Sequence, residues 1–112
     1  RGLRFPEQIP MNNRVSGYLG LANRAGKVLV GEAITKVWSK RKIYALIMAT
    51  DAASKTQEKL AKLAQQQNVP TIYAFSKAEL GRALGFEEVS TVAISDRGLA
   101  SQIISVIKED NK

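Results

Sequence analysis

Residues Lys27 to Lys42 read KVLVGEAITKVWSKRK, and their pattern is the strongest indication of the fold. Their apolar run at 28–30 predicts a short strand, and Gly31 is expected to end that strand and begin a helix. Four apolar residues recur at helical spacing after the glycine and are predicted to face a core: Ala33, Ile34, Val37 and Trp38. A helix that starts in this way presents unpaired backbone N–H groups, which attract anions. The stretch therefore predicts an anion-facing junction at Gly31.

Helices and strands are predicted to alternate on both sides of this stretch. A helix over about 13–25 should precede it, with Asn12 or Asn13 as its N-cap. The nearly continuous apolar run at 43–49 predicts a strand that is buried on both faces and central in a sheet. Farther on, helices are expected over 54–67, 76–84 and 97–107, with strands over 71–75 and 91–95. Such alternation predicts an α/β domain, with a largely parallel sheet between two helical layers and the 28–30 strand at an edge.

Polar residues are expected to fix the starts of several helices. Ser54 with Gln57, and Ser76 with Glu79, both match the capping box, in which the two side chains satisfy N–H groups at the helix start. Asp96 is expected to cap the last helix in the same way.

Asp51 is interpreted as an acceptor for N–H groups at the start of the helix that follows it. Residues 1–11 carry two prolines and no periodic pattern, so we expect a flexible tail followed by a single domain over 12–108.

The composition excludes several classes of function. The chain has no cysteine and no histidine, which removes disulfides, thiolate metal sites and the commonest general base. Gly26 and Lys27 do not form a phosphate-binding P-loop, because the upstream glycine and the following Ser or Thr are missing. We therefore expect no catalytic residues, no metal and no cofactor. No apolar run approaches the roughly 18 residues that a membrane span needs, and a cytoplasmic monomer is expected.

The positive charge is concentrated in the first half of the chain. The sequence has 17 Lys and Arg against 10 Asp and Glu, and the region 24–42 alone holds six basic residues and one acidic residue. Such a distribution favours a polyanionic partner, above all nucleic acid, although a charge that serves only solubility is the alternative. Lys55, Lys59 and Lys62 are interpreted as a solvated helix face.

Four segments resemble the L7Ae/L30e ribosomal protein superfamily, and in particular its small bacterial members. They are LGLANRAGKVLVGEA at 19–33, TDAAS at 50–54, VPTIYAFSKAELGRALGF at 69–86 and VAISDRGLA at 92–100. The resemblance covers roughly residues 12–107. It implies a three-layer α/β/α sandwich with a mixed, mostly parallel four-stranded sheet. It also implies a non-enzymatic, ribosomal or ribosome-associated protein that binds structured RNA of the kink-turn kind.

The resemblance also implies which residues contact RNA. In this superfamily the start of the second helix enters the kinked RNA beside sheared G·A pairs, and a loop before the last strand packs on a flipped-out base. At the helix start, the corresponding residues are Gly31, Glu32, Ala33 and Lys36. In the loop they are Phe86, Glu87, Glu88 and Val89, of which Phe86 is interpreted as half-buried support. Phosphates are expected to contact Lys27, Lys40 and Arg41.

One motif departs from the superfamily pattern. Many members read Gly-Thr-Asn-Glu at the helix start, whereas this chain reads Gly-Glu-Ala-Ile at 31–34, so the amide that reads a base edge is replaced. Two alternatives to a self-sufficient RNA-binding protein remain open. One is an accessory RNA-binding partner of an RNA-modifying enzyme, and the other is a protein-interaction adaptor of the same fold that binds no RNA.

Overall fold

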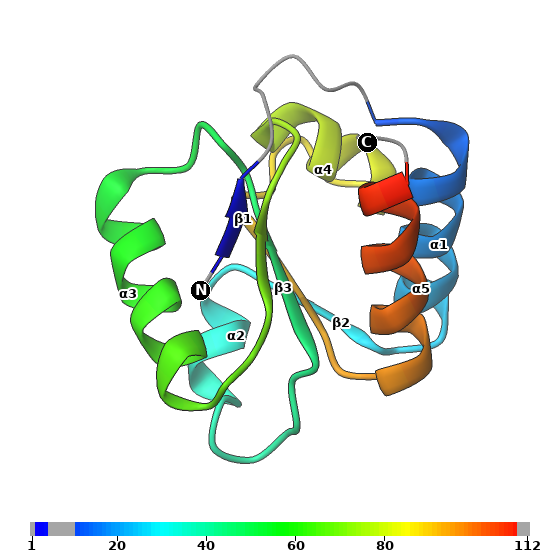
Figure 1. The fold of residues 1–112 in the computed structure, drawn as a ribbon. Coiled ribbons are helices and arrows are strands. Elements are labelled where there is room, and N and C mark those ends of the chain that lie inside the picture. The colour runs from blue at the N-terminus through cyan, green and yellow to red at the C-terminus, as the bar shows by residue number, and fades with distance from the viewer. Residues whose placement is uncertain (1, 5–10, 110–112) are drawn as a thin grey trace.

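A computed structural model describes residues 2–4 and 11–109 of the chain. The strands are β1 (Gly2–Arg4), β2 (Val28–Val30), β3 (Ala45–Met48), β4 (Thr71–Tyr73) and β5 (Thr91–Ile94). The helices are α1 (Asn13–Arg24), α2 (Glu32–Lys36), α3 (Ser54–Gln66), α4 (Lys77–Leu84) and α5 (Arg97–Glu109). Figure 1 shows α1 and α5 on one side of the sheet and α2 and α3 on the other, so the predicted three-layer α/β/α sandwich is confirmed.

The sheet has the strand order β1-β4-β3-β5-β2. As predicted, the 28–30 strand lies at an edge, and the strand from the 43–49 run is central and buried at every position. The predicted four strands are joined by a fifth, because residues 2–4 of the expected tail pair in parallel with β4. The pattern of side chains could not reveal β1, because the free backbone edge of β4 is what recruits it. The rest of the expected tail, residues 1 and 5–10, lies outside the described residues.

The sheet is less parallel than expected. β4 runs parallel to β1 and β3, but β5 runs antiparallel to both β3 and β2. β5 runs antiparallel because the chain takes a short path through α4. The loop after α4 folds back, so that the Val89 N–H donates to the carbonyl oxygen of Lys77 at 3.0 Å. The chain therefore re-enters the sheet at the end where it left β4, which reverses the direction of β5.

α2 is shorter than the pattern predicted, and it buries less. It ends at Lys36, and the N–H groups of Lys40 and Arg41 both donate to the carbonyl oxygen of Val37 at 2.9 Å, which turns the chain toward β3. Of the four residues predicted to face the core, Ile34 is fully buried, Val37 and Trp38 are partly buried, and Ala33 is exposed. A helix of one and a half turns has room for only one fully buried side chain on this face.

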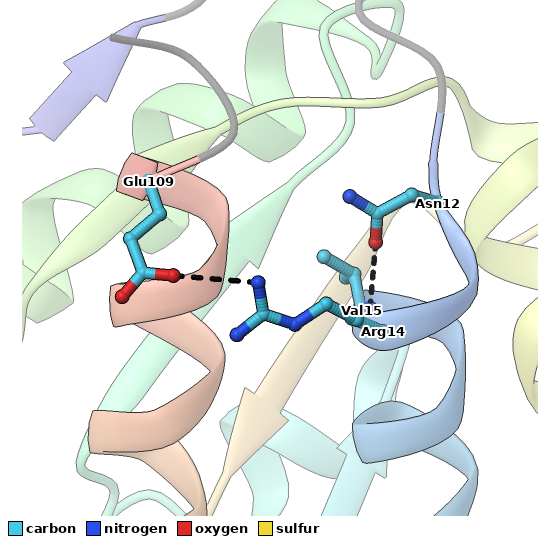
Figure 2. Close-up of polar contacts among 4 residues, drawn as sticks. All are labelled: Asn12, Arg14, Val15 and Glu109. Atoms are coloured by element: carbon cyan, nitrogen blue, oxygen red, sulfur yellow. Dashed lines mark hydrogen bonds and ion pairs between the residues drawn. The ribbon is translucent and has the colours of Figure 1, made fainter.

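Three of the predicted caps are present. The Asn12 side chain accepts a hydrogen bond from the Val15 N–H at 3.0 Å, and Figure 2 shows this cap beside the ion pair between Arg14 of α1 and Glu109 of α5. Ser76 and Glu79 form the complete capping box of α4. The carboxylate of Asp96 accepts from the Leu99 N–H at 2.9 Å. These caps fix the helix starts, whereas the exposed ion pair, at 3.4 Å, contributes less than about 1 kcal/mol.

The capping box predicted at Ser54 and Gln57 is absent. The N-cap of α3 is Ala53, and the side-chain amide of Gln57 instead donates to the carbonyl oxygen of Ala49 at 3.2 Å. Asp51 was predicted to serve the start of the same helix, but its carboxylate accepts from the Lys77 N–H of α4 at 2.9 Å. The end of β3 is therefore tied to the starts of both α3 and α4.

Candidate nucleic-acid interface

Gly31 forms an open junction between β2 and α2. Its backbone angles, φ +59° and ψ −138°, lie in a region that side-chain-bearing residues rarely adopt, so the turn requires glycine for its conformation. A Cβ atom added to this glycine would meet nothing within 4 Å. Glu32 and Ala33, which follow it, are both exposed. No described side chain therefore covers the junction, and a ligand can approach the backbone closely.

A hollow of about 200 Å³ lies against this junction. Its lining comes from the β2–α2 turn, the first two turns of α3 and the residue before β5: Gly31, Glu32, Thr35, Thr56, Lys59, Leu60 and Ser90. We call this set the junction hollow. Three hydroxyl groups, a carboxylate and an ammonium group surround a buried leucine, so the hollow combines hydrogen-bond donors and acceptors with a small apolar floor.

The residues predicted at the helix start are exposed, and five further residues line the junction hollow. Gly31, Glu32, Ala33 and Lys36 are all exposed at the start of α2 or one turn along it. The sequence analysis did not assign these five residues to the site: Thr35, Thr56, Lys59, Leu60 and Ser90.

Lys59 is exposed, as expected for a solvated helix face, and it also lines the junction hollow. The spacing of Thr56, Lys59 and Leu60 on one face of α3 was the available signal, but the packing of that face beside α2 had no signature in sequence. Because α2 has only five residues, its dipole contributes little. The unpaired N–H groups of its first turn are the relevant feature.

The predicted loop, residues 86–89, is held against α4. The Phe86 N–H donates to the carbonyl oxygen of Gly81 at 2.8 Å, and Phe86 is 51% exposed. Glu87 and Glu88 are exposed. Val89 was expected to contact RNA, but its side chain is buried in the core, which removes it from the surface.

Lys27, Lys40 and Arg41 lie away from the junction. The Arg41 guanidinium donates to the carbonyl oxygen of Gly26 at 3.1 Å and to the hydroxyl of Ser95 at 2.8 Å, which places it at the start of β2. The full length of β2 separates Lys27 from Gly31, about 13 Å at roughly 3.3 Å per residue of extended chain. The predicted RNA-contacting residues thus form two groups, one at each end of β2.

Most of the basic residues between Arg24 and Lys42 lie at the end of β2 opposite Gly31. Of the six basic residues in 24–42, only Lys36 belongs to α2. Four carboxylates lie at or near the Gly31 end of the sheet: Glu32, Asp51, Glu87 and Glu88. These basic residues are close to Gly31 in sequence but not in space, because the extended strand β2 separates the two ends.

Comparison with known proteins identifies the family. The model of the family described as "Ribosomal protein L7Ae/L30e/S12e/Gadd45 family" matches residues 13–104, which include β2, α2 and every residue of the junction hollow. The chain belongs to this family. The resemblance seen in the sequence alone is thereby confirmed.

Two curated relatives of this L7Ae-family chain are bacterial. It is 37% identical over 90 residues to the "RNA-binding protein YlxQ" of Bacillus subtilis (strain 168), an alignment that covers 80% of this chain and 90% of that protein. It is 31% identical over 91 residues to the "RNA-binding protein YlxQ" of Enterococcus faecium, which covers 80% and 87% of the two chains. Both alignments span most of each protein, so the similarity extends over the domain.

Solved structures share the L7Ae-family fold. A protein of unknown function from Bacillus halodurans C superposes with a TM-score of 0.80 at 26% identity, covering 87% of this chain and 99% of that one. The Giardia lamblia 15.5kD RNA binding protein superposes with a TM-score of 0.66 at 21% identity, covering 95% and 98%, and supports the fold alone. Within residues 2–4 and 11–109, no helix has the length and apolarity needed to cross a bilayer.

Proposed function

We propose that this protein is a non-enzymatic RNA-binding protein that recognises kink-turn-like internal loops through the junction hollow. The observation that carries the proposal is the open Gly31 turn, where exposed backbone at the start of α2 adjoins the polar lining of the hollow. Family membership supports it, because two relatives that align over most of their length are named RNA-binding proteins. We propose that these loops belong to ribosomal or ribosome-associated RNA.

The hollow suits bases that have left a regular stack. Proteins that read RNA sequence target unstacked bases in loops and bulges, because the edges of stacked A-form bases are hard to reach. The Glu32 carboxylate can accept a hydrogen bond from the amino group of a guanine. Because the carboxylate is charged, it is a stronger acceptor than the neutral hydroxyl groups of the hollow. The Thr35 hydroxyl donates to the Glu32 carbonyl oxygen at 3.0 Å, which orients its lone pairs outward as acceptors.

The surroundings of the hollow suit the RNA backbone. Lys36 lies one turn along α2 from Glu32, and Lys59 lines the hollow from α3, so two ammonium groups flank the opening from different helices. Phe86, in the neighbouring loop, is 51% exposed and can stack on a base that is flipped out of the RNA. Because these groups fit a bent RNA better than a straight one, binding shifts the RNA toward its kinked conformer.

A titration with two RNAs at two salt concentrations tests the proposal. A labelled kink-turn and a straight duplex of the same length are titrated with the full chain, and affinity is followed by fluorescence anisotropy. We expect the kink-turn to bind at least tenfold more tightly at both salts, and affinity to fall with salt as about five phosphate contacts require. Equal affinity for the two RNAs would refute recognition of the kink, and no binding of either would leave the adaptor role.

A further inference from the structure

The end of the sheet opposite Gly31 carries a second concentration of charge. Four connecting segments meet there: 25–27 after α1, 38–44 before β3, 67–70 before β4, and 95–97 after β5. They contribute five cations, Lys27, Lys40, Arg41, Lys42 and Arg97. Their one carboxylate, Asp96, is occupied in capping α5. We call these five residues the basic end.

Hydrogen bonds fix the segments of the basic end to one another. The Arg41 guanidinium bridges the turn at Gly26 and the hydroxyl of Ser95, and both the N–H and the hydroxyl of Ser95 donate to the Lys27 carbonyl oxygen, at 2.8 and 3.2 Å. Arg41 therefore stabilises the local structure in addition to contributing a positive charge. The segment it anchors holds Lys40 and Lys42 at a defined place, so their ammonium groups are presented on a rigid base.

Lys40 and Lys42 are free to take an external anion. Both are exposed and line a hollow of about 390 Å³, together with Trp38 and Gln67. Across the described ranges 2–4 and 11–109, the recorded ion pair joins Arg14 and Glu109, so no described carboxylate neutralises either lysine within 4 Å. The four carboxylates near Gly31 have no counterpart here except Asp96. Five cations against one carboxylate give the basic end a net positive charge that attracts a polyanion over a distance.

We propose that the basic end is a second RNA contact, which binds the sugar–phosphate backbone of a duplex stem continuous with the kinked RNA in the junction hollow. The proposal rests on the proposed function for the identity of that RNA. Lysines suit this task, because a flexible ammonium contacts phosphates without reading sequence. The distance along β2 from Lys27 to Gly31, roughly 13 Å, corresponds to about four nucleotide steps at 3.4 Å each. A stem longer than that can reach both ends of the strand.

The two contacts then have separate roles. The junction hollow distinguishes a kinked RNA from a straight one, while the basic end supplies affinity that depends on salt and not on shape. Removing the two lysines should lower the salt dependence without changing the preference for the kink.

The double variant Lys40→Ala/Lys42→Ala tests this division of roles, since both side chains are exposed and neither makes a recorded hydrogen bond. The matched control is Arg14→Ala/Lys62→Ala, which removes the same charge from α1 and α3. Kink-turns with stems of about four and about twelve base pairs, and a straight duplex, are titrated at 50 and 200 mM salt. For the long stems we expect the slope of log affinity against log salt to fall by about 2, so that the wild type's loss of affinity across this range exceeds the variant's about tenfold.

The short-stem kink-turn should bind the double variant and the wild type alike, and the control variant should keep the wild-type slope on every RNA. An unchanged slope for the double variant on long stems would overturn the proposal. Weakened binding of the straight duplex, with long-stem kink-turns unaffected, would also overturn it, because the surface would then take a separate duplex. If wild type fails to prefer the kink-turn while the double variant still loses duplex affinity, the proposed function fails and the basic end stands as a duplex contact.

Discussion

Replacing Gly81 by alanine is expected to lower the free energy of unfolding by about 2–3 kcal/mol. A Cβ atom at this position of α4 would lie 2.7 Å from the carbonyl oxygen of Glu87 and 2.9 Å from the Cα atom of Glu88. These are backbone atoms of a loop that two hydrogen bonds tie to α4, so no flexible side chain can move aside. The loop must shift or the helix must bend. Urea-induced unfolding, followed by circular dichroism, measures the loss.

Gly17→Ala is the matched control. Gly17 lies in the exposed middle of α1, and an added Cβ atom would meet nothing within 4 Å. The same substitution is therefore expected to stabilise the protein by about 0.5–1 kcal/mol, because alanine restricts the unfolded chain and favours a helix. The two variants should change stability in opposite directions. A stability loss of the same size in both would show that the contact between α4 and the loop is not what makes Gly81 necessary.

The double variant Lys36→Ala/Lys59→Ala is expected to weaken binding of a short-stem kink-turn by about tenfold to a hundredfold. Each lysine would lose one charge-assisted contact to the RNA backbone, at about 1 kcal/mol or more apiece. Lys59 lines the hollow and Lys36 follows the lining residue Thr35 on α2, so their losses should combine on the same RNA. Fluorescence anisotropy with the short-stem RNA excludes the contribution of the basic end.

Lys62→Ala provides the comparison on α3. Lys62 is exposed one turn along the helix from Lys59, but it does not line the junction hollow. It should leave the affinity within about twofold of the wild type, because an exposed charge that makes no contact in the hollow is weakened by salt screening. If Lys62→Ala weakened binding as much as the Lys36 and Lys59 pair, the effect would reflect net charge and not the hollow.

Local patterns predicted most of the fold. The apolar runs at Ala45–Met48 and Thr91–Ile94 gave two buried strands, and the polar residues Asn12, Ser76 and Asp96 marked three helix starts. Each of these signals acts within a few residues of its partner, since a cap bonds two or three positions along the chain. A glycine with positive φ at position 31 could likewise be inferred from its place between a strand and a helix.

Features that depend on distant partners could not be predicted in this way. Asp51 resembles a cap for the nearest helix, yet its acceptor serves Lys77, 26 residues away. Lys59 reads as one of three equivalent lysines until α3 is placed beside α2. The distance between Lys27 and Gly31 depends on whether the chain between them is extended or helical. The direction of β5 depends on the end of the sheet to which the loop after α4 returns.

Backbone amide chemical shifts, recorded as a short-stem kink-turn is added to the isotope-labelled protein, show whether RNA binds at the junction hollow. We expect the largest shift changes at residues 31–33 of the β2–α2 turn, together with Thr56, Lys59 and Ser90 of the junction hollow. Amides of α1 and α5 should change little, because these helices cover the opposite face of the sheet (Figure 1). Saturating binding with the largest changes on α1 and α5, and with the Gly31 amide unmoved, would contradict binding at the junction hollow.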